Sequence, residues 1–189
     1  MRPIRRQHLK HDLIDFAASE PSGGLTFHEH LSAGPVTLAH ASSRPVEGRH
    51  LAASQVIVAI HEGKAFEMNW HGVESDRVQS ITVTHGQTHI GDARLPFWVR
   101  HSASPSFFAI ALDESFVGEI WEKAFDRAGD FSIQASIGIE DPVIGRLGAR
   151  HNSFVSRPRR TSPVAMILCV GNSDHAVKQS WINPQRYAE

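Results

Sequence analysis

Residues 55–70 read Gln55-Val-Ile-Val-Ala-Ile-His-Glu-Gly-Lys-Ala-Phe-Glu-Met-Asn-Trp70. The run after Gln55 is apolar and rich in β-branched residues, which is typical of a buried strand. From residue 65 onward apolar and polar residues alternate, so Phe66, Met68 and Trp70 are expected to share one face of a second strand. Residues 61–64 would then connect a β-hairpin, in which Gly63 is able to adopt a positive φ.

Further short strands are predicted on the carboxyl side of this pair. Apolar, β-branched and aromatic residues gather at 78–83, 88–90, 97–100 and 106–112, with turn residues such as His85-Gly86 between them. Strands at this spacing, with no long helical pattern between them, are typical of a β-sandwich or β-barrel. We therefore expect a mainly β domain at residues 25–112, preceded by a leader at residues 1–24 with one short helix around 13–17.

A helical pattern begins at Asp113, a residue type that often caps helix N-termini. Apolar residues follow with helical spacing at 116, 117, 120, 121, 124 and 125. A second helix is predicted to start at Asp141-Pro142, because proline is favoured at the first helical position. We assign residues 113–150 to a helical extension of one or two helices. Residues 151–189 have no usable periodicity, so we expect an atypical tail there that could be disordered.

The composition excludes several classes of protein. The 189 residues include 19 Lys+Arg and 20 Asp+Glu, a formal net charge of −1, without the basic excess of a nucleic-acid-binding domain. The single Cys169 excludes an intrachain disulfide and favours a reducing compartment. No apolar stretch reaches the about 18 residues of a membrane-spanning helix. We therefore expect a soluble cytoplasmic protein with no membrane partner.

Several stretches together carry a resemblance to a known family. They are Pro45-Val-Glu47, residues 54–70, His85-Gly86, Pro96-Phe-Trp-Val-Arg100, the run 107–117 that leads into the amphipathic helix, and Asp141-Pro-Val-Ile144. Over roughly residues 25–148 the chain resembles the N-terminal sensory domain of AraC-type transcription regulators. The resemblance implies a cupin-like β-barrel or sandwich followed by helices, which binds a small effector or mediates dimerisation.

The resemblance also implies a carboxyl-terminal pair of helix-turn-helix units that reads the major groove. The residues after Arg150 do not resemble such a domain, so we expect a truncated regulator that cannot bind specific DNA alone. Whether the tail is a frameshift product, and whether the chain is vestigial, the sequence leaves open. We expect no enzymatic activity and no cofactor. The expected partners are an unknown small-molecule effector and a second copy of the chain or a full-length relative.

Candidate binding residues follow from this fold, because small barrels can enclose one small ligand. The candidates for lining the pocket are Phe66, Met68, Trp70, Phe97 and Trp98, with His61 and Arg100 as polar groups that could orient an anion. An ordinary core remains the alternative for each apolar residue. Phe116, Ile120 and Trp121 on the predicted helix are the candidates for dimerisation.

The alternative function is a small metal-dependent cupin enzyme. His28 and His30 are spaced to place two imidazoles on one face of a strand, and His101 follows Pro96 at the spacing of the last histidine of a cupin motif. The glutamate that the enzymatic pattern requires after the first pair is missing, and Trp98 stands where the pattern has glycine. A metal site needs three or four converging ligands, so we expect no metal here.

Overall fold

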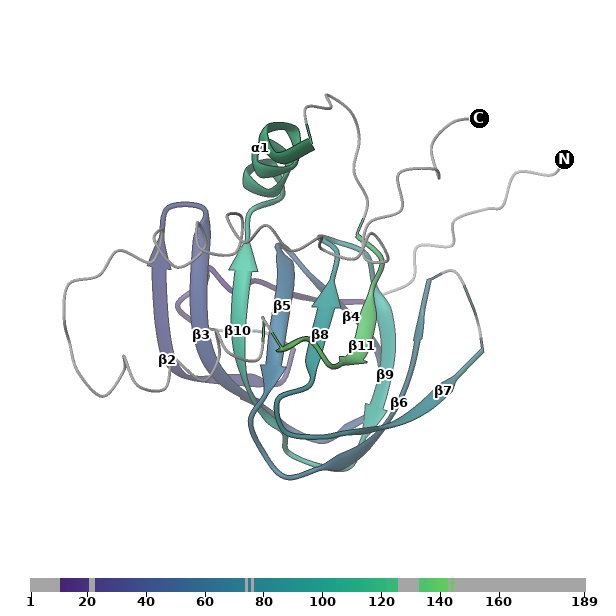
Figure 1. The fold of residues 1–189 in the computed structure, drawn as a ribbon. Coiled ribbons are helices and arrows are strands. Elements are labelled where there is room, and N and C mark those ends of the chain that lie inside the picture. Colours follow the sequence, from purple (N-terminus) through teal and green to yellow (C-terminus); the bar gives the residue numbers. More distant parts are fainter. Residues whose placement is uncertain are drawn as a thin grey trace, which may run out of the picture.

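The computed structural model describes residues 11–20, 23–73, 75, 77–125, 133–142 and 144. Figure 1 shows that strands dominate this part of the chain. The strands are β1 (Asp12–Ile14), β2 (Leu25–Ala33), β3 (Val36–Ser43), β4 (Val46–Ala53), β5 (Val56–His61), β6 (Phe66–Gly72), β7 (Gln79–Val83), β8 (Thr88–Gly91), β9 (Phe97–His101), β10 (Ser106–Leu112) and β11 (Ser136–Ile139), with one helix, α1 (Glu114–Phe125).

The strands form two sheets in an interleaved order. One sheet has the order β1-β4-β9-β6-β7 and the other β11-β8-β5-β10-β3-β2. Strands β3 to β10 supply four consecutive members of each sheet, and all their pairings within a sheet are antiparallel. This is the two-sheet arrangement of a jelly roll, the architecture found in cupins. The expected mainly β, cupin-like fold is thus confirmed.

The main core lies between the two sheets and is built by alternating side chains. Ile57, Ala109 and Ala111 face inward from the six-stranded sheet, where they meet Met68 and Val99 of the five-stranded sheet. Each of these residues is less than a tenth exposed. Burial of this apolar surface from both sides is what holds the sheets together.

The connection at residues 61–64 is not a hairpin, as the sequence had suggested. β5 pairs with β8 and β10, whereas β6 pairs with β7 and β9, so the chain crosses here from one sheet to the other. Gly63 does not have a positive φ. A Cβ at Gly63 would lie 3.2 Å from both His61 Cε1 and Ser106 Oγ, so the glycine serves close packing at this crossing.

The leader is part of the fold, and the helix expected around residues 13–17 is wrong. β1 pairs in parallel with β4, and Ile14 and Phe16 are only 6% and 2% exposed. Buried Gln55 fixes this segment, since its Oε1 accepts the Phe16 N–H at 3.2 Å and its Nε2 donates to Asp15 Oδ1 at 2.7 Å. Residues 1–10 lie outside the described residues.

The predicted helix is present as α1, which directly follows β10 (Figure 1). Phe116 packs on a second apolar cluster, formed by Val36, Leu38, Ile60 and Phe108 on the outer face of the six-stranded sheet. The rest of the stripe is more open, with Ile120 38% and Phe125 47% exposed. Among the described residues, no helix has the length and apolar character needed to cross a membrane.

Within the rest of the expected helical extension, the structure has a strand that was not predicted, while Pro142 and Ile144 are helical as the start at Asp141-Pro142 predicted. That strand, β11, adds to the six-stranded sheet by antiparallel pairing with β8. The capping role of Asp141 is present, because its Oδ1 accepts the Ile144 N–H at 3.2 Å. The tail at 151–189, including Cys169, lies outside the described residues.

We predict that Phe116→Ala lowers the free energy of unfolding by about 2 kcal/mol, because it removes half-buried aromatic surface from the second cluster. Phe125→Ala removes the same ring from an exposed site and should change stability by about 0.5 kcal/mol or less. Denaturant unfolding of dilute protein measures both. Equal losses in the two variants would show that α1 is not docked through Phe116.

Candidate ligand-binding cavity

A cavity of about 160 Å³ lies between the two sheets. Its wall is largely apolar, with residues from both sheets and from the amino-terminal segment. Contributors include Ile57, Ala59 and His61 of β5, Phe66, Met68 and Trp70 of β6, His89 of β8, Phe97, Val99 and His101 of β9, and Phe107 of β10, together with Ile14, Phe16 and Asp92. A concave, mainly apolar site with a few polar groups is the usual form of a small-molecule site.

Five of the seven pocket candidates line this cavity, namely His61, Phe66, Met68, Trp70 and Phe97. Along β5, β6 and β9, side chains point alternately to the inner and the outer face of the sheet. These five residues occupy inward-facing positions, so their side chains meet in the cavity. That they bind a ligand stays a prediction. The sequence analysis missed Ile14, Phe16, His89 and Asp92, although alternation within residues 88–91 could have indicated His89.

Trp98 and Arg100 lie outside the cavity, contrary to expectation. Because Phe97, Val99 and His101 of β9 face inward, the two residues between them must face outward. Trp98 stacks on His71, with ring centroids 5.4 Å apart and an interplanar angle of 16°. It also lies against Gly48, whose φ is 107° and where a Cβ would be 2.8 Å from Trp98 Cζ2. Arg100 is exposed and cannot orient an anion inside.

Two of the three cavity imidazoles are oriented by backbone carbonyls. His61 Nε2 donates to the Lys64 carbonyl at 2.9 Å, and His101 Nδ1 donates to the Ala103 carbonyl at 3.0 Å. Phe66 packs on both rings, with centroid distances of 5.1 Å to His61 and 5.6 Å to His101. Burial lowers the pKa of His101 and the Arg49 charge adds to the effect, while the bond to Ala103 opposes it.

His89 differs from the other two because it has no hydrogen-bond partner among the described residues. It lies opposite Ala59 in the β5–β8 pairing, on the inner face of the six-stranded sheet. Burial, with nearby His61 as a smaller cause, lowers the pKa of His89 from 6.5 to about 4. At neutral pH the ring is therefore uncharged, with one N–H donor and one acceptor nitrogen at the cavity wall.

The charge of the cavity wall is limited to Asp92, and no Lys or Arg lines the described part of it. Asp92 Oδ1 accepts the Ala93 N–H at 2.9 Å and Oδ2 accepts the Ile133 N–H at 3.4 Å. Burial raises the pKa of Asp92, against the lowering effect of these two bonds. Arg49 is engaged elsewhere, donating to Asp12 Oδ2 at 2.8 Å and to the Gly23 carbonyl at 2.6 Å.

Two of the three histidines of the alternative metal site, His28 and His30, face opposite sides of β2, so the expectation that they share a face is wrong. β2 contains a bulge, since Phe27 pairs with Ala41 but Glu29 pairs with His40. His30 therefore turns inward, stacks on Phe27 at 5.2 Å and donates from Nε2 to the Phe16 carbonyl at 2.7 Å. His28 stays on the outer face.

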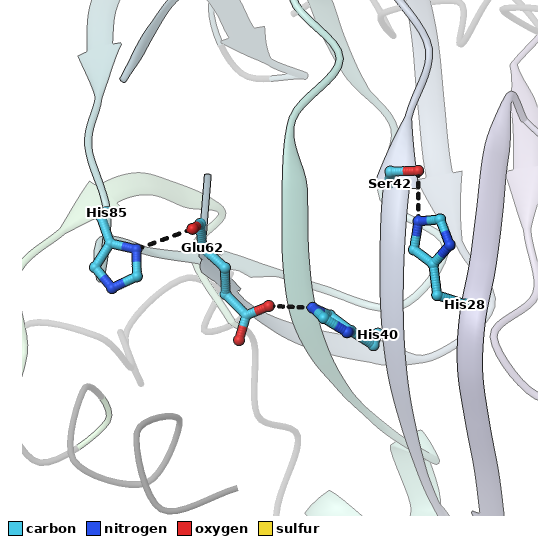
Figure 2. Close-up of polar contacts among 5 residues, drawn as sticks. All are labelled: His28, His40, Ser42, Glu62 and His85. Carbon is cyan, nitrogen blue, oxygen red and sulfur yellow. Dashed lines mark hydrogen bonds and ion pairs between the residues drawn. The ribbon is translucent and has the colours of Figure 1, made fainter. Parts of the chain in front are cut away.

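Figure 2 shows the polar contacts on that outer face. His28 Nε2 bonds to Ser42 Oγ at 2.9 Å, His40 forms an ion pair with Glu62, and His85 Nδ1 donates to the Glu62 carbonyl at 3.0 Å. In the described part of the chain, no group of three or more His, Cys, Asp or Glu residues is arranged to hold a metal ion. The described residues therefore do not fit the metal centre that cupin enzymes use.

Comparison with known proteins gives no match to a family model and no match to a curated protein. Among solved structures, the chain is similar to a cupin domain from Bordetella pertussis, with 12% identity, a TM-score of 0.37 and coverage of 51% of this chain and 98% of that one. It is also similar to a cupin superfamily protein from Desulfitobacterium hafniense, with 12% identity, a TM-score of 0.37 and coverage of 51% and 83%. At such TM-scores these matches carry no argument, and the cupin-like class rests on the strand order.

We predict that His89 makes the protein less stable in acid. The unfolded chain takes up the proton near pH 6.5, whereas the folded chain resists it down to about pH 4. The contribution of neutral His89 to the free energy of unfolding is therefore complete above pH 6.5. It declines by about 1.4 kcal/mol per pH unit as the pH falls from 6.5 to about 4. In urea unfolding across this range, His89→Phe should flatten the decline, whereas His28→Phe on the outer face should not. An unchanged slope in His89→Phe would contradict the prediction.

Proposed function

We propose that the chain is the small-molecule-binding and dimerisation domain of an AraC-type transcription regulator, and that it is not itself an enzyme. The observation that carries this proposal is the largely apolar cavity between the sheets, whose wall includes an imidazole with no hydrogen-bond partner among the described residues. The resemblance of residues 25–148 to sensory domains of that family supports the same role. The effector would bind between β5, β6, β8 and β9.

Dimerisation through α1 is the second part of the proposal. Ile120 and Phe125 are exposed, and Trp121 packs on Phe125 with ring centroids 4.2 Å apart. An apolar stripe of this kind is stabilised when a second copy, or a full-length relative in the cytoplasm, covers it. We propose that the chain influences transcription through such pairing, since the described residues are mainly β-sheet and offer no helix-turn-helix pair for specific DNA binding.

A cavity-filling substitution tests the binding site. Ala59→Leu places extra atoms in the cavity, so it should abolish binding of ring-sized compounds such as toluene and phenol. Val58→Leu enlarges a side chain by one carbon on the opposite face of the same strand and should leave binding intact. Ligand-observed NMR with the full chain measures this. Failure of the wild-type chain to bind any ring-sized compound, or equal binding by both variants, would contradict the proposed site.

The oligomeric state tests the role of α1. We predict a dimer for the wild-type chain in sedimentation equilibrium, and a monomer for the double variant Ile120→Glu/Trp121→Glu, because two buried carboxylates would be unpaired. Lys123→Glu is the control on the same helix, since its side chain is 79% exposed and makes only an intrahelical ion pair with Glu119. A wild-type monomer, or a dimer that survives the double substitution, would exclude this interface.

A further inference from the structure

The imidazole of His89 is a polar group at the cavity wall that has no hydrogen-bond partner among the described residues. His89 lines the wall on the inner face of β8, and the other two imidazoles there already donate to the carbonyls of Lys64 and Ala103. The ring is half-buried, and its nitrogens can bond to a molecule that enters the cavity. Such a group facing an apolar cavity points to a ligand that supplies the missing hydrogen bond.

Resting on the proposed binding function, we infer that the cavity takes an uncharged, ring-sized molecule with one hydroxyl, of the class of simple phenols and aryl alcohols, and that this hydroxyl bonds to His89. The ring lies against the apolar wall formed by Phe66, Met68 and Phe97.

The size of the cavity sets the size of the ligand. Its volume of about 160 Å³ is close to that of an engineered apolar protein cavity of about 150 Å³ that binds benzene. A monocyclic molecule with one or two substituent atoms fits such a space. A sugar or nucleotide would carry more polar groups than this wall can satisfy.

The charges at the wall exclude an anionic ligand. The described lining contains no Lys or Arg, the guanidinium of Arg49 is engaged by Asp12 and Gly23, and Arg100 faces the outside. Asp92 is the charged residue that remains, and it would repel a carboxylate or phosphate. An unpaired anion in such a site would carry a large desolvation cost.

The hydrogen-bonding capacity of the imidazoles favours a hydroxyl over a carbonyl. Neutral His89 can donate or accept, whereas neutral His101 has committed its N–H to Ala103 and keeps only an acceptor nitrogen, Nε2. A hydroxyl donates as well as accepts, so it suits either ring. A carbonyl oxygen only accepts, so it could use the N–H of His89 alone.

Titration calorimetry at pH 7.5 with the full chain tests this inference. Phenol and toluene differ by a hydroxyl in place of a methyl group, and benzoate and benzylamine add the two charges. We expect phenol to bind more tightly than benzoate, and because Asp92 would attract an ammonium group, benzylamine is the compound that separates a neutral ligand from a cationic one. In His89→Leu, we expect phenol affinity to fall about tenfold and toluene affinity to remain or rise. His89→Gln, which keeps a donor and an acceptor, should retain most of the phenol affinity, and His71→Leu on the outer face should have no effect.

The outcomes separate this inference from the function on which it rests. If the wild-type chain binds none of the four compounds, both the binding function and the ligand class are wrong. If toluene and phenol lose affinity equally in His89→Leu, or if benzoate or benzylamine binds the wild type more tightly than phenol, the cavity remains a binding site but the ligand class is wrong. If His89→Leu does not fold, the affinities of the four compounds for the wild-type chain and the phenol affinity of His89→Gln still test the ligand class.

Discussion

The strict alternation of side chains along paired strands is the constraint on which the site depends. In β9, the antiparallel pairing with β4 and β6 fixes Phe97, Val99 and His101 toward the opposite sheet and sends Trp98 and Arg100 outward. The same rule turns His89 inward from β8. The described residues thereby give the cavity imidazoles and apolar groups but no guanidinium. Its chemistry is that of neutral imidazoles and one carboxylate, that of Asp92, in a largely apolar wall.

Periodicity was sufficient to predict a large part of this from the sequence. The alternation of Phe66, Met68 and Trp70 predicted a shared face that the cavity confirms, and the helical spacing of 116–125 predicted α1. The apolar runs at 55–60 and 106–112 gave two central strands of one sheet. These features depend on neighbours within a few residues, which is why the sequence pattern contains them.

The errors arose where pairing with distant residues decides the structure. Ile14 and Phe16 fit a helix or a strand by spacing, and only the pairing of residues 12–14 with β4 selects a strand, after which the bonds of Gln55 hold the following turn. One inserted residue at the β2 bulge turns His30 away from the face of His28. The amino-acid sequence of a short connection such as 61–64 does not distinguish a hairpin between neighbouring strands from a crossing between two sheets.

The state of the His89 ring in solution tests the central claim most directly, because the claim requires a neutral imidazole that faces the cavity and has no hydrogen-bond partner among the described residues. Nitrogen-15 NMR of the histidine side chains, recorded from pH 8 to pH 4.5 with and without phenol, measures that state. We predict that His89 stays neutral over this range, consistent with its pKa of about 4, and that phenol shifts one of its ring nitrogens. A His89 that titrates near pH 6.5 and does not respond to phenol would contradict the claim.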